Sequence, residues 1–261
     1  MDNIKGKWAL VTGASSGFGM DFATALAERG ANLILTARRT EPMEKLAASL
    51  RALHGIEVVV EAADLAAPGA GSALKAQLDS HGLAVDVLIN NAGFGVYGQF
   101  VDQPLGKTLE MLQLNVLSLT ELTHVFAADM VKRGGGHILL VASIGGYQAT
   151  PTYAAYAASK AYVLLFGEAL HTELTPSKVK VSVLSPGVTA TGFLAVSGQQ
   201  TTPYQRLLMM RSRPVVDIGL KALFNGTASV IPGVGNKLTI FSNRFAPRSL
   251  QSRVAYQLMK N

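Results

Sequence analysis

The sequence predicts a single α/β domain built on a doubly wound parallel sheet of about seven strands. Short β-branched or apolar runs alternate with longer amphipathic segments, and this alternation is typical of right-handed βαβ units with helices on both faces of a sheet. Six runs are expected to be strands: residues 8–12, 32–36, 57–61, 85–90, 137–142 and 180–184. A seventh strand is expected at residues 228–231, and the least regular stretch is 189–203.

Composition limits the functional classes. Hydrophobic residues make up 49% of the 261 residues and charged residues 15%, which favours a globular chain with a substantial core. No run approaches the roughly 18 apolar residues of a membrane-spanning helix, and residues 1–7 lack the apolar core of a signal peptide, so a cytoplasmic protein is expected. The absence of cysteine excludes disulfides, thiolate metal sites and a cysteine nucleophile.

The net charge of +6 is concentrated at the C-terminal end. Residues 201–261 contain nine Lys or Arg and one acid, Asp217, whereas the first 200 residues contain fourteen Lys or Arg and sixteen acids. Such a basic segment can favour an anionic substrate, an acidic membrane surface or nucleic acid. Solvated surface charge is the commoner explanation and the one we favour.

A glycine-rich turn follows the first expected strand. It comprises Gly13, Ala14, Ser15, Ser16, Gly17, Phe18 and Gly19, and a helix is expected over residues 20–29. Glycines allow positive φ and a close approach of backbone to a pyrophosphate, whose charge is stabilised by the helix N-terminus. Alone, such a turn is also compatible with an ordinary βα connection, but its place after the first strand favours dinucleotide binding.

The end of the second expected strand indicates which dinucleotide is bound. An acid there would accept hydrogen bonds from the ribose of NAD, but this chain has Arg38 and Arg39 instead. Guanidinium groups suit the 2′-phosphate of NADP, so NADP(H) is the expected cofactor, with Arg38 the stronger candidate. The alternative is that both arginines are solvated residues at a helix start.

Tyr156 and Lys160 are four residues apart and are expected on one face of a helix. A nearby cation favours the phenolate, so Lys160 could bring proton transfer by Tyr156 closer to neutral pH. Viewed alone, the pair could also be a half-buried tyrosine above a solvated lysine.

Two further polar residues accompany this pair. Ser143 ends the apolar strand 137–142, where its hydroxyl could orient a substrate oxygen, and the surrounding residues lack the first glycine of a hydrolase nucleophile elbow. Asn115 is an amide inside a mostly apolar helical segment, where it could hold a proton-relay water or simply pack between helices.

Together these motifs resemble the classical short-chain dehydrogenase/reductase family over residues 7 to about 190. The resemblance is carried by Thr12-Gly13-x-x-x-Gly17-x-Gly19, Asn90-Asn91-Ala92-Gly93, Asn115, Ser143 and Tyr156-x-x-x-Lys160. It implies a Rossmann-type fold and an oxidoreductase that transfers hydride between NADP(H) and a carbonyl or alcohol. It also implies four catalytic roles, with Tyr156 as general acid or base, Lys160 lowering its pKa and binding ribose, Ser143 polarising the carbonyl, and Asn115 anchoring a water.

The resemblance implies further cofactor contacts beyond the glycine turn and the arginines. Asp64 and Leu65 would lie against the adenine, and residues 90–93, including Asn91, Ala92 and Gly93, would line the cofactor cleft. The nicotinamide carboxamide would be held by Pro186, Gly187, Val188 and Thr189. By the same resemblance, residues 1–190 form the cofactor-binding and catalytic core, 189–225 a substrate lid, and 226–261 the last strand and a basic C-terminal extension.

The substrate is expected to be a small-molecule carbonyl or alcohol compound, with a hydrophobic ketone or aldehyde fitting best. The expected pocket residues are Phe94, Ser143, Tyr153 and Phe193, together with the segments 144–148 and 193–199, although each could be ordinary core. A homodimer or homotetramer is implied, formed through the apolar residues 162–166. The tail, residues 237–261, mixes apolar and basic residues and could bind a membrane surface, although packing on its own chain or on another subunit is favoured.

Three other functional classes are weaker. A cofactor-bound sensor without turnover would usually lack the Tyr or Lys, and both are present. Nucleic-acid binding is supported only by the basic tail, so no nucleic-acid partner is expected. The five histidines show no metal-ligand spacing, so no metal site is expected.

Overall fold

The structure is a computed structural model that describes residues 4–260, apart from the side chain of Tyr204. Met1, Asp2, Asn3 and Asn261, which belong to the expected domain, lie outside the described residues. Its main sheet has seven parallel strands in the order β3-β2-β1-β4-β5-β6-β9. The strands are β1 (Trp8–Thr12), β2 (Asn32–Ala37), β3 (Val58–Ala62), β4 (Val85–Asn90), β5 (Gly136–Val141), β6 (Val179–Leu184) and β9 (Ser229–Val230). The predicted fold class and number of strands are therefore confirmed.

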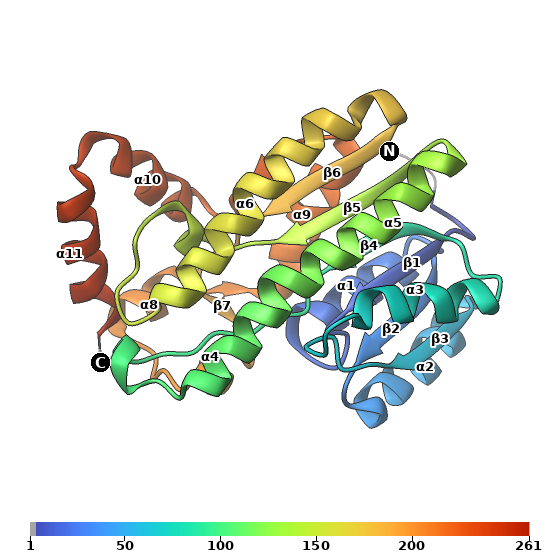
Figure 1. Cartoon of the computed structure of the whole chain (residues 1–261), viewed down its shortest axis with the longest axis horizontal. Coiled ribbons are helices and arrows are strands. Elements are labelled where there is room, and N and C mark those ends of the chain that lie inside the picture. Colours follow the sequence, from blue (N-terminus) through green and yellow to red (C-terminus); the bar gives the residue numbers. More distant parts are fainter. Residues whose placement is uncertain (1–3, 261) are drawn as a thin grey trace.

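Helices cover both faces of this sheet (Figure 1). One layer contains α1 (Gly17–Ala27), α2 (Thr40–His54) and α9 (Ser212–Asn225). The other contains α3 (Ala70–Ser80), α5 (Leu119–Arg133) and α6 (Ala154–Leu174). The two-residue period of the strands divides the core, because Ala9 and Val11 pack towards the first layer and Leu10 towards the second.

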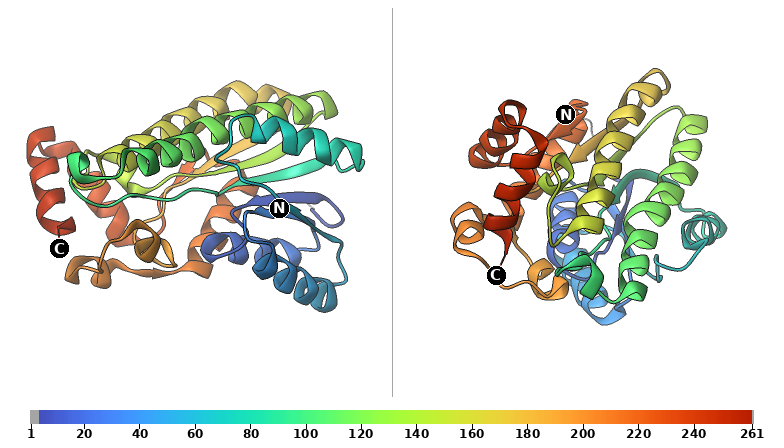
Figure 2. Two further views of the ribbon diagram at one scale, coloured as in Figure 1. Left: turned by 60° about the horizontal axis from the view of Figure 1, so that its bottom comes forward. Right: turned by 60° about the vertical axis from the view of Figure 1, so that its left-hand side comes forward.

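The remaining helices gather beyond the carboxyl ends of the strands. These are α4 (Leu105–Leu112), α7 (Phe193–Ser197), α8 (Pro203–Leu208), α10 (Val234–Ser242) and α11 (Arg248–Met259). Figure 2 shows α10 and α11 at one end of the molecule, next to the C-terminus. Strand order reverses at β1, which lies between β2 and β4, and ligands of doubly wound sheets bind at the carboxyl side of this point.

Several predicted bounds were wrong. The first helix begins at Gly17 rather than at residue 20, β5 starts and ends one residue earlier than expected, and β9 has only two residues. Ser143 therefore lies two residues after the end of β5, with Ala142 between them. These differences arise because hydrogen bonding to neighbouring strands, which the sequence does not display, determines where each strand ends.

Two local features were not predicted. The stretch expected to be least regular contains α7 and a two-residue strand, β7 (Thr189–Ala190), which pairs with β8 (Met210–Arg211) in a second small parallel sheet. Asn115 lies in a π-helical segment, Gln113–Ser118, between α4 and α5. Such π-helical insertions are frequent at functional sites.

Candidate active site

A cavity of about 900 Å³ opens at the carboxyl ends of the strands. Its walls come from the glycine turn, from the loops after β2 to β6, and from α6, α7 and the C-terminal helices α10 and α11. Of the predicted site residues, the cavity is lined by Gly13, Ser15, Ser16, Gly17, Phe18, Arg38, Arg39, Asp64, Leu65, Asn91, Ala92, Gly93, Phe94, Ser143, Tyr153, Tyr156, Lys160, Pro186, Gly187, Val188, Thr189 and Phe193. Gly19 and Asn115 lie behind the wall.

The glycine turn is shaped by two close approaches. Gly13 has φ +68°, and a Cβ added there would lie 3.0 Å from the Asn91 Nδ2 atom. A Cβ at Gly19 would lie 2.2 Å from the Gly13 carbonyl oxygen, closer than any real contact. Gly19 thus lets the first turn of α1 pack directly on the turn that precedes it, which leaves backbone rather than side chains at the strand end.

The ends of β1 and β4 are joined by Thr12 and Asn91. The Thr12 hydroxyl accepts hydrogen bonds of 2.9 Å from the Asn91 and Ala92 backbone N–H groups, and Asn91 Nδ2 donates a bond of 2.8 Å to the Thr12 carbonyl. Thr12 belongs to the motif identified in the sequence, but only the structure shows that it positions the loop after β4.

The expectation that Asn90 lines the cofactor cleft was wrong. Its amide donates to the Leu119 carbonyl at 3.0 Å and to the Thr123 hydroxyl at 3.2 Å, and its side chain is buried. It is therefore not part of the cavity wall and instead anchors α5 to β4.

Arg38 and Arg39 both reach the cavity but differ in their partners. Arg39 Nη2 donates to the Ser15 hydroxyl at 3.2 Å and to the Ser15 carbonyl at 3.3 Å. Arg38 Nη1 pairs with Glu110 Oε1 at 3.1 Å. Although Arg38 comes first after β2, Arg39 is the guanidinium attached to the glycine turn.

Asp64 and Leu65 follow β3 at the same edge. The Asp64 carboxylate accepts a hydrogen bond of 3.1 Å from the Ala66 backbone N–H, which fixes the turn, and Leu65 is buried. Both line the cavity next to the loop that carries Arg38 and Arg39, because β3 pairs with β2 and the arginines follow β2.

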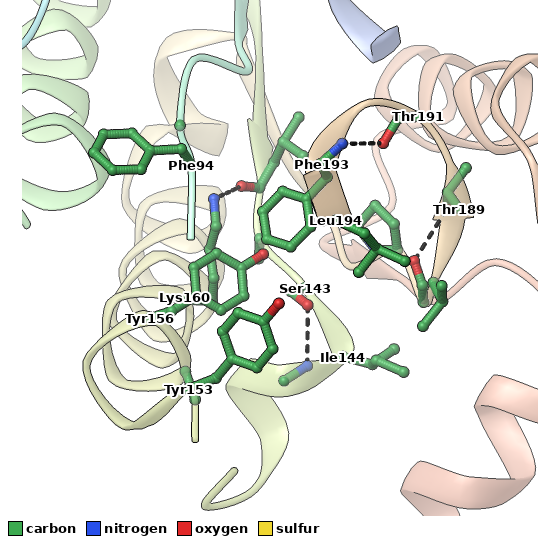
Figure 3. Close-up of a pocket in the computed structure, with 18 of the residues that line it drawn as sticks. Phe94, Ser143, Ile144, Tyr153, Tyr156, Lys160, Thr189, Thr191, Phe193 and Leu194 are labelled. Atoms are coloured by element: carbon green, nitrogen blue, oxygen red, sulfur yellow. Dashed lines mark hydrogen bonds between the residues drawn. The ribbon is translucent and has the colours of Figure 1, made fainter. Parts of the chain in front are cut away.

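Ser143, Tyr153, Tyr156 and Lys160 come together at the other side of the cavity (Figure 3). The Ser143 hydroxyl accepts a hydrogen bond of 3.1 Å from the Gly145 N–H. Tyr156 and Lys160 lie on the same face of α6, and the Tyr153 and Tyr156 ring centres are 5.6 Å apart. The helical turn Ile144–Tyr147 packs closely on α6 only because residue 146 is glycine, since a Cβ there would lie 2.7 Å from the backbone of Lys160.

Burial changes the acidity of this cluster. Lys160 is only 5% exposed, and desolvation lowers the pKa of its ammonium to about 8. Desolvation also raises the pKa of the Tyr156 phenol well above its ordinary value, and the Ser143 hydroxyl partly offsets this by favouring the phenolate. The expected lowering of the Tyr156 pKa by Lys160 is thus not the net result in this structure. The ammonium donates a hydrogen bond of 2.8 Å to the Val141 carbonyl.

Asn115 holds the loop after β4 against α6. Its Nδ2 donates to the Phe94 carbonyl at 2.9 Å and to the Ser159 hydroxyl at 3.2 Å, and its Oδ1 accepts from the Phe94 N–H at 3.2 Å. A Cβ on Gly93 would lie 2.8 Å from Asn115 Oδ1 and 3.6 Å from Lys160 Nζ. The amide therefore positions backbone beside Lys160, and its expected role as a water anchor stays a prediction.

Aromatic rings form the part of the cavity next to Tyr156. Phe193 lies 5.3 Å from the Tyr156 ring centre and is stacked with Tyr153 at 6.5 Å. A Cβ on Gly95 would lie 2.8 Å from the Phe193 ring, so this glycine makes room for it. Ile144, Gln148, Val196 and Gln199 from the expected pocket segments also line the cavity.

The C-terminal helices contribute a wall that sequence reasoning missed. The additional lining residues include Ile240, Ala246, Leu250, Val254, Leu258 and Met259. Leu250, Val254 and Leu258 recur every four residues, a spacing that indicates one apolar face of a helix and could have identified this wall.

A buried polar network fastens α11 to residues 199–205. Gln199 Nε2 donates to the Met259 carbonyl at 2.7 Å, and Gln199 Oε1 accepts from Gln205 at 2.8 Å and from the Tyr153 hydroxyl at 3.0 Å. Gln199 and Gln205 are both buried. The inner side of the tail therefore packs on its own chain, which was one of the expected arrangements.

The cavity fits a dinucleotide. The glycine turn exposes backbone at the cavity wall, Arg38 and Arg39 line the same cavity, and so does the buried Lys160 with its ammonium. Gly187, which also lines the cavity, packs against Asn236, because a Cβ there would lie 2.4 Å from Asn236 Nδ2. Ligand pockets usually enclose about 300–1,000 Å³, and this cavity is at the upper end of that range.

Two features of the described residues bear on other classes. Within residues 4–260, no helix has the length and apolar character needed to cross a bilayer. In the same part of the chain, no group of three or more His, Asp or Glu side chains is arranged to hold a metal ion.

Residues 7–202 match the short chain dehydrogenase family. Among individual proteins, the chain is 30% identical to the ketoacyl reductase HetN of Nostoc sp. over 231 residues, which cover 88% of this chain and 80% of that protein. It is 34% identical to a very-long-chain 3-oxoacyl-CoA reductase of Anas platyrhynchos over 197 residues, which cover 74% of this chain and 62% of the other. The matches to two fungal very-long-chain 3-oxoacyl-CoA reductases span only 53% and 56% of those proteins.

Solved structures show the same arrangement over nearly the whole chain. A short-chain dehydrogenase from Sphingobium yanoikuyae in complex with NADPH superposes with a TM-score of 0.83 at 31% identity, covering 94% of this chain and 95% of the other. A 7β-hydroxysteroid dehydrogenase superposes with a TM-score of 0.88 at 27% identity, covering 98% and 99%. The likeness extends to α10 and α11, which lie beyond the residues that match the family.

Proposed function

The chain belongs to the short-chain dehydrogenase family, and from this premise we propose that it is an NADP-dependent reductase of hydrophobic ketones or aldehydes with Tyr156 as the proton-transfer group. Membership makes it an oxidoreductase acting on carbonyl or alcohol groups. The observation that carries the proposal is the meeting of Ser143, Tyr156 and Lys160 in one cavity that the glycine turn also lines.

Tyr156 is assigned as general acid in reduction and general base in oxidation. NADPH, when bound, supplies the hydride to the carbonyl carbon. The oxygen then gains negative charge, and the Tyr156 hydroxyl donates a proton to it while the Ser143 hydroxyl donates a hydrogen bond. A high pKa suits the donor role at rest, since burial keeps the phenol protonated.

Lys160 is assigned to ribose binding and to electrostatic support of Tyr156. Its buried ammonium lies beside Gly93, and an ammonium next to the phenol favours the phenolate that remains after proton donation. Asn115 acts through position, because it holds Phe94 and Gly93 against α6.

NADP is preferred to NAD in this proposal because of Arg38 and Arg39. No acid follows β2, and both guanidinium groups line the cavity beside the glycine turn, where a 2′-phosphate would accept charge-assisted hydrogen bonds. Asp64 and Leu65 are assigned to the adenine, and residues 186–189 to the nicotinamide carboxamide. The similar NADPH-bound structure supports this preference.

The substrate is proposed to be apolar because aromatic and aliphatic side chains surround the space beside Tyr156. Tyr153 and Phe193 pack on the Tyr156 ring, and Phe94 and aliphatic residues of α11 line the same cavity. Residues 189–225 are assigned as the substrate lid, held to α11 through Gln199. The named reductases and the hydroxysteroid dehydrogenase among the similar proteins support a hydrophobic carbonyl compound.

Assembly as a homodimer or homotetramer is proposed through residues 162–166 of α6. Leu165 is 68% exposed and Tyr162 is exposed as well, which gives this segment apolar surface to bury. A monomer in light scattering at micromolar concentration would contradict this assignment. The cytoplasmic location expected from the sequence also stays a proposal, and fractionation of the source cells would test it.

An NADPH-consumption screen tests the proposed function. The panel contains ketones, aldehydes, quinones and 3-oxoacyl esters, each assayed with NADPH and with NADH. Turnover of apolar ketones or aldehydes, faster with NADPH, is the expected result. A chain that binds NADPH but turns over no member of the panel would instead be a cofactor-bound sensor.

A further inference from the structure

Helix α10 and the short helical turn after it, Asn243–Phe245, present an apolar face that points away from the cavity. Val234, Leu238, Phe241 and Phe245 are spaced by four, three and four residues, which places them on one side of a helix. Their exposed fractions are 73%, 63%, 52% and 77%. The opposite side, with Ile240 and Asn243, lines the cavity, so self-packing accounts for only one face of this helix.

The segment that carries this face is rich in cations and contains no acid. Residues 232–261 contain Lys237, Arg244, Arg248, Arg253 and Lys260 but no Asp or Glu. The Arg244 guanidinium lies 5.7 Å from the Phe241 ring centre, and the Phe241 and Phe245 rings are 5.4 Å apart. Arg244 and Arg248 also line a recess of about 310 Å³ together with Tyr147, Ile240, Asn243 and Gln251.

We propose that this outer face, hereafter the α10 face (Val234, Lys237, Leu238, Phe241, Arg244 and Phe245), docks the enzyme on the surface of an anionic lipid bilayer. Apolar side chains interleaved with cations are the composition by which amphipathic helices lie in the headgroup region. The apolar residues enter the acyl boundary, and the cations pair with lipid phosphates.

Charge favours a lipid surface over a second copy of the chain. A two-fold contact would place the α10 face against itself, so its cations would meet cations with no acid from the same segment to neutralise them. Nucleic acid would satisfy the cations but would leave the exposed phenylalanine and leucine side chains without an apolar environment. An anionic bilayer satisfies both kinds of side chain.

The position of the face agrees with an apolar substrate. Helices α10 and α11 form one end of the molecule (Figure 2), and the half-exposed Leu250 and Val254 lie at the cavity wall of the same end. Docking there would bring the cavity close to the bilayer. The inference does not depend on the proposed reaction, because the surface exists whatever the cavity binds.

Vesicle co-flotation of the full-length chain tests the proposal. The probes are vesicles of phosphatidylcholine alone and of phosphatidylcholine mixed with phosphatidylglycerol. The wild-type chain should float with the mixed vesicles at low salt, bind the neutral vesicles much less, and be released as the salt concentration rises. The double variant Phe241→Ser/Phe245→Ser should lose about tenfold or more of its vesicle affinity. Lys237→Glu/Arg244→Glu should lose at least about fivefold for each cation removed.

Matched controls lie on other surfaces. Leu53→Ser removes an exposed leucine from α2 (72% exposed), and Lys132→Glu reverses an exposed charge near the end of α5. Both should float as the wild type does. Binding to anionic vesicles no better than to neutral ones, or equal loss in the controls, would overturn the proposal. A further result would also overturn the proposal: neither the wild type nor any variant binds vesicles, and light scattering shows a dimer that the Phe241→Ser/Phe245→Ser substitutions dissociate.

Discussion

The ammonium nitrogen of Lys160 lies 5.9 Å from the centre of the Tyr156 ring. Both side chains are fixed by α6, and the ammonium is held by the Val141 carbonyl at the end of β5. Burial disfavours the charged form of each group, the ammonium of Lys160 and the phenolate of Tyr156. The two pKa values therefore shift in opposite directions. Burial lowers the pKa of Lys160 to about 8 and raises that of Tyr156.

The lowered pKa of Lys160 predicts a pH-dependent stability. Between about pH 8 and the ordinary lysine pKa of 10.5, the unfolded chain binds a proton that the folded chain has lost. The free energy of unfolding therefore rises with pH in this window, by at most about 1.4 kcal/mol per pH unit. Lys160→Met lacks this dependence, so the wild type should gain stability relative to the variant as the pH rises. Urea unfolding of both proteins at several pH values, without cofactor, measures this, and parallel curves would contradict it.

Cofactor preference should depend on the two arginines after β2. Arg38→Ala/Arg39→Ala removes both guanidinium groups and should raise the KM for NADPH by about tenfold or more, since a charge-assisted hydrogen bond contributes about 1.5–3 kcal/mol. The KM for NADH should change little.

Glu110→Gln is the matched comparison for the arginine variant. It removes only the carboxylate that pairs with Arg38 and should leave the KM for NADPH unchanged or lower it. If the double arginine variant kept the wild-type ratio of the two KM values, the assignment of the 2′-phosphate site would be wrong.

Gly19 should tolerate no side chain. In Gly19→Ala the methyl group would meet the Gly13 carbonyl at 2.2 Å, so either α1 or the glycine turn must shift. The expected result is loss of NADPH binding, measured by quenching of the single tryptophan or by calorimetry, together with a lower midpoint of thermal unfolding.

Gly106→Ala in α4 is the control for that substitution. No described atom outside its own helix and neighbours lies within 4 Å of the added methyl group, and its φ is not in the left-handed region. It should bind NADPH normally and gain up to about 1 kcal/mol of stability from helix propensity. Equal loss of binding in both variants would show that the close approach at Gly19 is not the cause.

The wall formed by α11 should discriminate between substrates by size. Val254→Asp places a charge at the apolar wall, where it should lower kcat/KM for a ketone with a long alkyl chain by about tenfold, since each buried methylene contributes about 0.8 kcal/mol. Acetone, which has no alkyl chain to pack against α11, should be affected little. Gln257→Asp adds the same charge on the exposed side of the same helix and should leave both substrates unaffected.

Much of the fold followed from local sequence pattern. The strand at Trp8–Thr12 and the strand at Val85–Asn90 were predicted to the residue, because apolar runs of five or six residues between turn signals leave little freedom. The pairing of β7 with β8 could not be predicted, since two-residue strands carry no periodicity and their partners lie about twenty residues apart.

The site divides in the same way. Gly13, Ser143, Tyr156 and Lys160 line one cavity because each follows a strand of a parallel sheet or lies on the helix after it, a placement that topology dictates. The attachment of Arg39 to Ser15, the pairing of Arg38 with Glu110, and the buried contact of Gln199 with Met259 depend on side-chain packing between distant segments. Neither residue type nor spacing signals such contacts.

Turnover by Tyr156→Phe tests the central assignment most directly. The substitution removes one oxygen and keeps the ring that packs on Tyr153 and Phe193. With a ketone that the wild type reduces, kcat should fall by about 10²- to 10⁴-fold while the Kd for NADPH stays nearly unchanged. A variant that binds NADPH and retains wild-type kcat would show that the proton comes from another group.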